Sequence, residues 1–193
     1  MTRSTARQGL SAQEFLAWEN EQPARHEYFR GEVFAMAGGS PRHNVLCSNV
    51  IAALHAALRD KGCVVLTSDQ RVGLAEGERY VYPDVSVVCG AIALEPGTRD
   101  VLTNPTALVE VLSGSTEQYD RGLKWEGYQR IASLDDYLLV SQSEPRVEHF
   151  RRSANAAWLY RAAKSGEHIE LSNGATVEVD AIFAGALELP GDV

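Results

Sequence analysis

Hydrophobic residues recur at helical spacing in two segments near the start of the chain. The first segment follows Ser11, which stands three residues before Glu14 as in a capping box, and predicts a short helix that ends before Pro23. The second predicts a long helix over residues 42–60, which is closed by Lys61-Gly62. Its apolar face is formed by Val45, Leu46, Val50, Ile51, Leu54 and Leu58.

Shorter apolar runs predict strands through most of the remaining chain. Aromatic and β-branched residues on both sides of Arg30-Gly31 predict a hairpin over residues 26–36. Further strands are expected over residues 63–68, 70–74, 82–89 and 107–112, near residues 137–140, 146–151 and 157–161, and twice more in the acidic tail. The runs at 82–89 and 107–112 are almost wholly apolar, which is typical of central strands covered on both faces.

One more helix is expected from about residue 119 to residue 132, between two groups of strands. The order of elements predicts an α/β fold in which a mixed β-sheet is flanked by helices. No long Pro/Gly/Ser-rich linker and no repeat divides the chain, so we expect a single domain over residues 1–193.

Charge is unevenly distributed along the chain. The formal net charge is -8, from 18 Lys and Arg against 26 Asp and Glu, which argues against a protein that coats nucleic acid or an anionic membrane. Residues 145–164 nevertheless carry five basic side chains against Glu148 alone, a local charge of +4. Arg146, Arg151 and Arg152 are therefore candidate contacts for a phosphate backbone, provided that they share a face with the functional site.

The cysteines and the hydropathy pattern restrict the class of protein further. Cys47, Cys63 and Cys89 are odd in number, far apart and never in a Cys-x-x-Cys pair, so we interpret them as small buried residues rather than disulfide partners or zinc ligands. No apolar run reaches the roughly 18 residues of a membrane span, and residues 1–15 lack the apolar stretch of a signal peptide. We expect a cytoplasmic protein without a membrane partner.

Two acidic residues occupy positions that otherwise look buried. Asp84 begins the strand run VSVVC, and Glu110 lies inside ALVEVL. An ionised carboxylate in such a strand is costly unless a positive group compensates it. If the two strands are neighbours, both acids meet at one end of the sheet, where a Mg²⁺ ion is the simplest partner. The alternative is that each acid pairs with an arginine or with backbone amides.

Polar residues near the following helix complete the candidate site. Lys124 can orient or help to deprotonate a water near the acids, or it can form an ordinary surface salt bridge with Asp120 four residues earlier. Tyr128 either faces the same cleft or packs, and residues 113–116 (Ser-Gly-Ser-Thr) either cradle a phosphate or cap the helix, which is the commoner use. His43 and, less strongly, Glu27 are further candidates for polar contacts, with capping or packing as the alternative for His43.

Several motifs, taken together and in order, resemble the Uma-type restriction endonuclease family, a branch of the PD-(D/E)XK nuclease superfamily. The resemblance covers roughly residues 10 to 151 and leaves residues 152–193 as a strand-rich acidic extension. It rests on Glu14-Phe15, His26-Glu27-Tyr28, Gly31-Glu32-Val33, the step from Ser40 to His43, PDVSVV at 83–88, VEVLS at 109–113, DRGxK at 120–124, Tyr128 and Tyr137.

The resemblance implies a restriction-endonuclease-like fold and Mg²⁺-dependent or Mn²⁺-dependent hydrolysis of DNA phosphodiester bonds. Asp84 and Glu110 would bind the metal. The superfamily's usual Glu-x-Lys would place a lysine at position 112, where this chain has Leu112, so the lysine function would have moved to Lys124. Many such nucleases pair two active sites, so a homodimer is expected. The alternative is a catalytically inactive nuclease-fold domain that binds nucleic acid or acts as an oligomeric interaction module.

Overall fold

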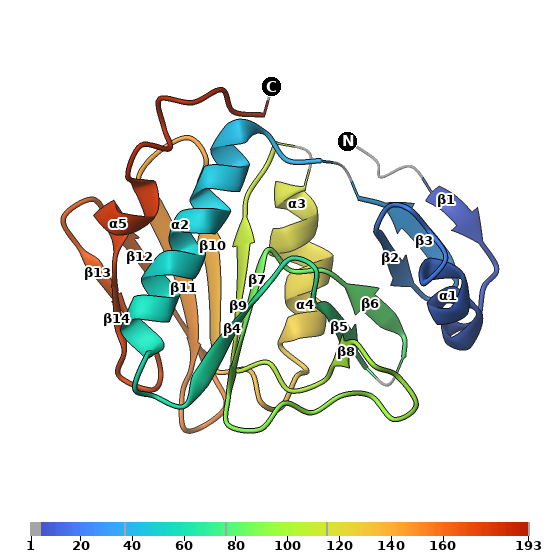
Figure 1. Cartoon of the computed structure of the whole chain (residues 1–193). Coiled ribbons are helices and arrows are strands. Elements are labelled where there is room, and N and C mark those ends of the chain that lie inside the picture. The colour runs from blue at the N-terminus through green and yellow to red at the C-terminus, as the bar shows by residue number, and fades with distance from the viewer. Residues whose placement is uncertain (1–4, 37, 76, 115, 193) are drawn as a thin grey trace.

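The protein is described by a computed structural model that covers residues 5–36, 38–75, 77–114 and 116–192 (Figure 1). Its strands form two six-stranded sheets and one small hairpin. The mixed α/β class expected from the sequence is confirmed, although the strands are divided between sheets instead of forming a single one. Within the described residues no helix has both the length and the apolar composition that a bilayer span requires.

The first sheet has the strand order β1-β3-β2-β6-β5-β8 and lies near the N-terminus in Figure 1. Its strands are β1 (Thr5–Gln8), β2 (His26–Phe29), β3 (Glu32–Ala35), β5 (Arg71–Leu74), β6 (Arg79–Val81) and β8 (Val101–Leu102). Helix α1 (Ala12–Glu19) begins with the expected capping box of Ser11 and Glu14. The expected hairpin is also confirmed, since Arg30 and Gly31 both have positive φ, as a two-residue hairpin turn of this type requires.

The second sheet has the order β12-β11-β10-β9-β7-β4, in which β9 and β10 are parallel and all other neighbours are antiparallel. Its strands are β4 (Cys63–Thr67), β7 (Val85–Cys89), β9 (Ala107–Val111), β10 (Asp136–Val140), β11 (Arg146–Arg152) and β12 (Trp158–Lys164). The two almost wholly apolar runs thus supply interior strands, as expected.

Helices cover both faces of this second sheet. Helix α2 (Pro41–Leu58), α5 (Val179–Phe183) and the hairpin of β13 (His168–Glu170) and β14 (Thr176–Glu178) enclose one hydrophobic core. On the other side, the crossover from β9 to β10 lies between the two sheets (Figure 1). This crossover consists of α3 (Glu117–Tyr119), a π-helical turn η1 (Asp120–Lys124) and α4 (Trp125–Tyr128).

Three local predictions were wrong. The strand expected over 82–89 begins only at Val85, because residues 82–84 link β6 (residues 79–81) of the first sheet to β7 (residues 85–89) of the second. The helix expected over 119–132 contains the π turn and ends at Tyr128. Cys63 and Cys89 are register partners on β4 and β7 and form a disulfide, while Cys47 is a free thiol. Their separation of 26 residues gave no indication of this cross-strand pairing.

Candidate active site

The antiparallel pairing of β7 and β9 brings Asp84 and Glu110 to the same end of the second sheet. Val85 is opposite Val109, so Asp84, one residue before β7, lies across from Glu110 near the end of β9. The backbone N–H of Val111 donates to Oδ2 of Asp84 at 2.7 Å. The two acids are therefore brought together. In the described structure neither pairs with an arginine, whereas Asp84 does accept a backbone amide, as the alternative expected.

Two side chains of the crossover from β9 to β10 donate hydrogen bonds to Glu110. The residue is only 3% exposed, and its Oε1 accepts hydrogen bonds from Lys124 Nζ at 3.0 Å and from Tyr128 Oη at 2.6 Å. The ring of Tyr128 packs in the core while its hydroxyl faces the site, so both alternatives expected for this residue apply. The carboxylate of Glu110 is thereby fixed in orientation by two donors.

Lys124 lies among three carboxylates inside the protein. Besides Glu110, its Nζ is 3.2 Å from Oε1 of Glu27 and 3.2 Å from Oδ1 of Asp120. Lys124 and Asp120 are both buried, so their contact is not the ordinary surface salt bridge considered as the alternative. The structure thus brings Glu27, Asp120 and Tyr128 to the same cluster as Glu110 and Lys124.

The charges in this cluster are strongly coupled. Burial raises the pKa of Glu110 well above its usual range, Lys124 opposes the shift, and the charges of Asp120 and Asp84 add to it. Burial also raises the pKa of Asp120. Burial acts to lower the pKa of Lys124, but Glu110, Glu27 and Asp120 outweigh it and raise that pKa well above its ordinary value. Lys124 is therefore a cation at neutral pH, surrounded by an excess of acid.

His43 approaches the acids from the start of α2. Its backbone N–H donates to the side chain of Ser40, which caps the helix, and its Nε2 lies 3.4 Å from Oδ2 of Asp84. Burial acts against the charge of His43, but the contact with Asp84 raises its pKa. On its other side, Nδ1 is 3.5 Å from Sγ of Cys47. Cys47 is a neighbour that the sequence analysis missed, although its position one helical turn after His43 was a usable signal.

The donor atoms of Asp84 and Glu110 fit a hard divalent cation. Among the described residues, hydrogen bonds reach Oδ2 of Asp84 and Oε1 of Glu110, and their other carboxylate oxygens accept none. The charge of Asp84 raises the pKa of Glu110, and a cation between the two would offset this repulsion. Carboxylate oxygens are the ligands that Mg²⁺ and Mn²⁺ prefer, so these residues suit either ion.

Residues 113–116 lie between β9 and α3. Ser115 is outside the described residues. The Ser113 hydroxyl accepts the backbone N–H of Thr116 at 3.2 Å, which joins these two residues just before α3. Thr116 is the N-cap residue of α3 by position, but its side chain makes no capping hydrogen bond.

The candidate phosphate contacts on β11 do not form one basic surface. Alternating strand positions place Arg146 and Arg152 on one face and Arg151 on the other, where Arg151 approaches Glu170 of β13 at 3.9 Å. The guanidinium of Arg152 donates to the carbonyls of Gln129, Ile131 and Leu134. The guanidinium of Arg152 is therefore engaged in hydrogen bonds within the protein. Of the three candidates, Arg146 borders a cavity of about 380 Å³ next to the site, which Ser113, Arg42 and Arg121 also line.

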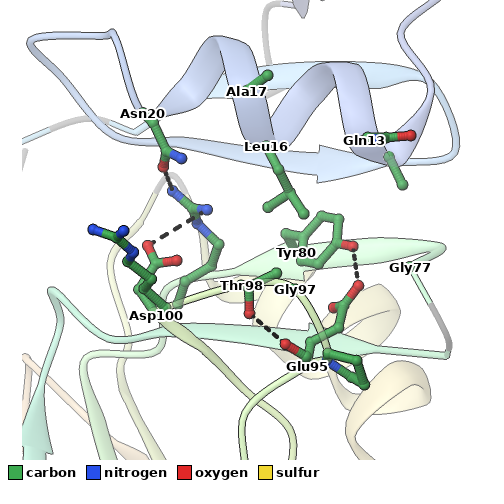
Figure 2. A pocket seen from close by; sticks show the side chains of 14 residues that line it. Gln13, Leu16, Ala17, Asn20, Gly77, Tyr80, Glu95, Gly97, Thr98 and Asp100 are labelled. Atoms are coloured by element: carbon green, nitrogen blue, oxygen red, sulfur yellow. Dashed lines mark hydrogen bonds and ion pairs between the residues drawn. The ribbon is translucent and has the colours of Figure 1, made fainter.

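A larger cavity, of about 890 Å³, lies between α1 and the loop before β8, apart from the acidic cluster (Figure 2). Its polar groups are largely paired with one another: Tyr80 donates to Glu95 at 2.9 Å, and buried Arg71 contacts Asn20, Tyr82 and Asp100. The candidate catalytic residues do not line it. The acidic cluster and the larger cavity are therefore separate features of the molecule.

Comparison with known proteins agrees with the family resemblance. Residues 12–190 match the family model Uma2, described as "Putative restriction endonuclease". The chain belongs to the Uma2 family. The match includes the acidic C-terminal segment, and it confirms the resemblance that residues 10–151 had indicated.

Synechocystis sp. carries two similar chains. The uncharacterized protein slr1290 is 36% identical over 180 residues, covering 91% of this chain and 92% of the relative. The uncharacterized protein sll1609 is 34% identical over 162 residues, covering 84% and 91%. The crystal structure of a "putative nuclease belonging to DUF820" from Anabaena variabilis superimposes with a TM-score of 0.73 at 16% identity, covering 93% of this chain and 100% of the other. This likeness confirms the restriction-endonuclease-like fold of the Uma2 chain.

Proposed function

We propose that this Uma2 chain is a metal-dependent endonuclease that hydrolyses phosphodiester bonds of DNA. The observation that carries the proposal is the meeting of Asp84, Glu110 and the buried Lys124 at one end of the second sheet. Membership in the Uma2 family supports a nuclease, and the choice of DNA as substrate is part of the proposal.

Asp84 and Glu110 would hold Mg²⁺ or Mn²⁺ through the carboxylate oxygens that accept no hydrogen bond from described residues. The ion, when bound, lowers the pKa of a water molecule and offsets negative charge on the phosphate. The protein's own contribution is orientation. The Val111 N–H fixes Asp84, and Tyr128 and Lys124 fix Glu110, so both carboxylates are preorganised before any ligand arrives.

Lys124 would orient the attacking water and stabilise the charge that develops on the phosphoryl oxygens. The surrounding acids raise its pKa, so it stays protonated at neutral pH and acts as a donor rather than a general base. Glu27 and Asp120 serve as positioning residues, because each holds Nζ at 3.2 Å. His43 would position Asp84 or contact the water from the opposite side.

The substrate would approach the end of β9 from the side of Arg146. Arg146 borders the 380 Å³ cavity there and is partly exposed, although Glu144 and Glu148 lie within 3.6 Å and 3.4 Å of its guanidinium. We therefore propose a local and salt-sensitive DNA contact, in keeping with the net charge of -8. Two copies of the chain would supply the two active sites needed to cut both strands.

Nicking of supercoiled plasmid DNA tests the proposed function. The purified protein should nick the plasmid with Mg²⁺ or Mn²⁺ and not with EDTA, and Asp84→Asn, Glu110→Gln and Lys124→Met should each reduce the rate at least about 100-fold. Glu126→Gln is the matched control, since this exposed acid lies on α4 and its ion pair is with exposed Arg130. Equal nicking by the wild type and the three site variants would indicate a contaminant and overturn the proposal.

The catalytically inactive nuclease-fold domain makes a different prediction for the same assay. Folded wild-type protein would bind DNA or self-associate without nicking it at any divalent-ion concentration. Thermal unfolding checks that each variant is folded, so an absence of nicking by stable wild-type protein would favour this second function.

A further inference from the structure

Beside the carboxylate pair lies a second set of possible metal ligands with a different chemistry. His43, Cys47 and Asp84 each offer one ligand atom, and the three atoms lie within 4.8 Å of one another. His43 and Cys47 are one turn apart on α2 and so present their side chains to the same side. Asp84 reaches them from the segment before β7, with Oδ2 at 3.4 Å from His43 Nε2.

The donors in this set are imidazole nitrogen, thiol sulfur and carboxylate oxygen. This combination suits Zn²⁺ or Cd²⁺, because thiolate sulfur selects soft or borderline metals, whereas Mg²⁺ takes oxygen ligands. Zn²⁺ binds these three donor types at about 2.0–2.3 Å, so neighbouring ligand atoms need to be about 3–4 Å apart. His43 would give one ring nitrogen to the ion: Nδ1 lies 3.5 Å from Cys47 Sγ, Nε2 lies 3.4 Å from Asp84 Oδ2, and one atom from each of the three residues lies within 4.8 Å of the others. A short inward movement of these side chains around a bound ion would therefore complete the site.

We propose that His43, Cys47 and Asp84 form a site for a thiophilic divalent cation such as Zn²⁺ or Cd²⁺, and that occupation of this site excludes Mg²⁺ from Asp84. Binding replaces the thiol proton: the Cys47 S–H bond breaks, a sulfur–metal bond forms and one proton is released to solvent. A fourth position stays open to water, as in three-ligand zinc sites. The site is reachable from solvent, since the side chains of His43 and Asp84 are 17% and 16% exposed.

The inhibitory consequence rests on the proposed nuclease function, whereas the binding site does not. Because Asp84 belongs to both ligand sets, Zn²⁺ and Mg²⁺ would compete for one carboxylate. A soft metal would then act as an inhibitor of the Uma2 site without touching Lys124. The sulfur ligand is the feature that separates this site from the carboxylate pair alone.

Cd²⁺ titration followed by ultraviolet absorption tests the binding site directly. The sulfur-to-cadmium charge-transfer band should grow to saturation at one Cd²⁺ per chain, and Cys47→Ser should remove it. The double variant Cys63→Ser/Cys89→Ser is the control for the other cysteines and should keep the band, since these two pair with each other across β4 and β7. A band that persists in Cys47→Ser, or one lost only in the double variant, would overturn the proposal, as would the absence of any band in the wild type.

Two further variants test the other ligands and the geometry. His43→Ala and Asp84→Asn should weaken Zn²⁺ binding, measured by calorimetry, at least about 10-fold. Substitution of a residue that only supports a metal ligand already lowers metal affinity by about 10-fold or more. Gly39→Ala keeps all three ligands but would place a Cβ 2.6 Å from Nδ1 of His43 and so turn the ring away. Gly39→Ala should therefore also weaken Zn²⁺ binding. Unchanged Zn²⁺ affinity in all three variants would contradict the site even if no nicking activity exists.

Discussion

At the residue scale, the central feature is one buried cation among three buried acids. Lys124 compensates Glu110, Glu27 and Asp120, and nearby Asp84 adds a further negative charge. A buried ion pair contributes little net stability when both partners are present, but loss of one partner leaves uncompensated charge in a low-dielectric environment. The arrangement therefore makes the fold depend on Lys124 and leaves the acids short of positive charge, which a divalent cation would supply.

The substitution Lys124→Met should lower the free energy of unfolding by about 3–5 kcal/mol near neutral pH, because three buried carboxylates lose their common partner. The loss should be smaller near about pH 5 than near about pH 8. Burial already raises the pKa values of Glu110 and Asp120, so in the variant they take up protons as the pH falls and the unpaired charge disappears.

Urea unfolding at the two pH values measures this effect. Arg130→Met is the matched control, since the Arg130–Glu126 pair lies on the exposed side of the same segment and should contribute less than about 1 kcal/mol. Equal stability of Lys124→Met and the control variant at both pH values would contradict the buried cluster.

At the scale of elements, the crossover from β9 to β10 carries most of the site. Its π turn begins at Asp120 and ends at Lys124, and α4 supplies Tyr128 one turn later. Turns of this kind occur frequently at functional sites. Contacts on both sides hold the segment: Arg79 of β6 donates to the carbonyl of Leu123, and Arg121 makes two hydrogen bonds to Glu148 of β11. The position of Lys124 thus depends on both sheets.

Arg152 fixes the end of the same crossover, and this use replaces the phosphate contact expected from sequence. Arg152→Met would leave the carbonyls of Gln129, Ile131 and Leu134 without their charged donor. We expect a loss of about 1–3 kcal/mol in the free energy of unfolding, measured by urea denaturation. The substitution Arg151→Met at the neighbouring position should lower the free energy of unfolding by less than about 1 kcal/mol. The ion pair that it removes, between Arg151 and exposed Glu170, is long at 3.9 Å. The opposite ranking of the two variants would show that Arg152 is not a structural residue.

At the scale of the whole molecule, much of the architecture could be predicted because local patterns and tertiary contacts agree. The capping box at Ser11, the turn at Arg30-Gly31 and the apolar face of α2 are each determined by short-range chemistry. The acids at positions 84 and 110 stood out because charges are rare in apolar strands. The two acids lie together because β7 pairs with β9, whereas an apolar pattern predicts strands without specifying which of them pair.

Features that depend on register or on distant contacts could not be read from the chain. The division of the strands between two sheets places Pro83-Asp84 at the passage from one sheet to the other. Pro83 lacks the N–H that a central strand donates and is a local signal for a break, but it does not show that two different sheets lie on its two sides. The Cys63–Cys89 disulfide depends on the β4–β7 register. By contrast, the opposite faces of Arg146 and Arg151 follow from the two-residue alternation along β11 and could have been predicted once that strand was expected.

The net charge of -8 is best understood from where the acidic and basic side chains lie in the whole molecule. Part of it is concentrated in the buried cluster around Lys124, and the basic residues of β11 are divided between two faces or paired with acids. Binding of DNA would therefore depend on a narrow contact near Arg146 and on the divalent cation at the acids. Both are local features, consistent with the exclusion of general nucleic-acid coating.

The proposed active site depends most on Asp84 and Glu110 sharing one divalent cation, and calorimetric titration with Mn²⁺ tests this directly. The wild type should bind one Mn²⁺ per chain at this site and Glu126→Gln should bind it equally well, whereas Asp84→Asn and Glu110→Gln, confirmed as folded by thermal unfolding, should bind it at least about 10-fold more weakly. Binding of Mn²⁺ with the same affinity by all four proteins, or no binding by the wild type at millimolar metal, would contradict a metal site shared by Asp84 and Glu110.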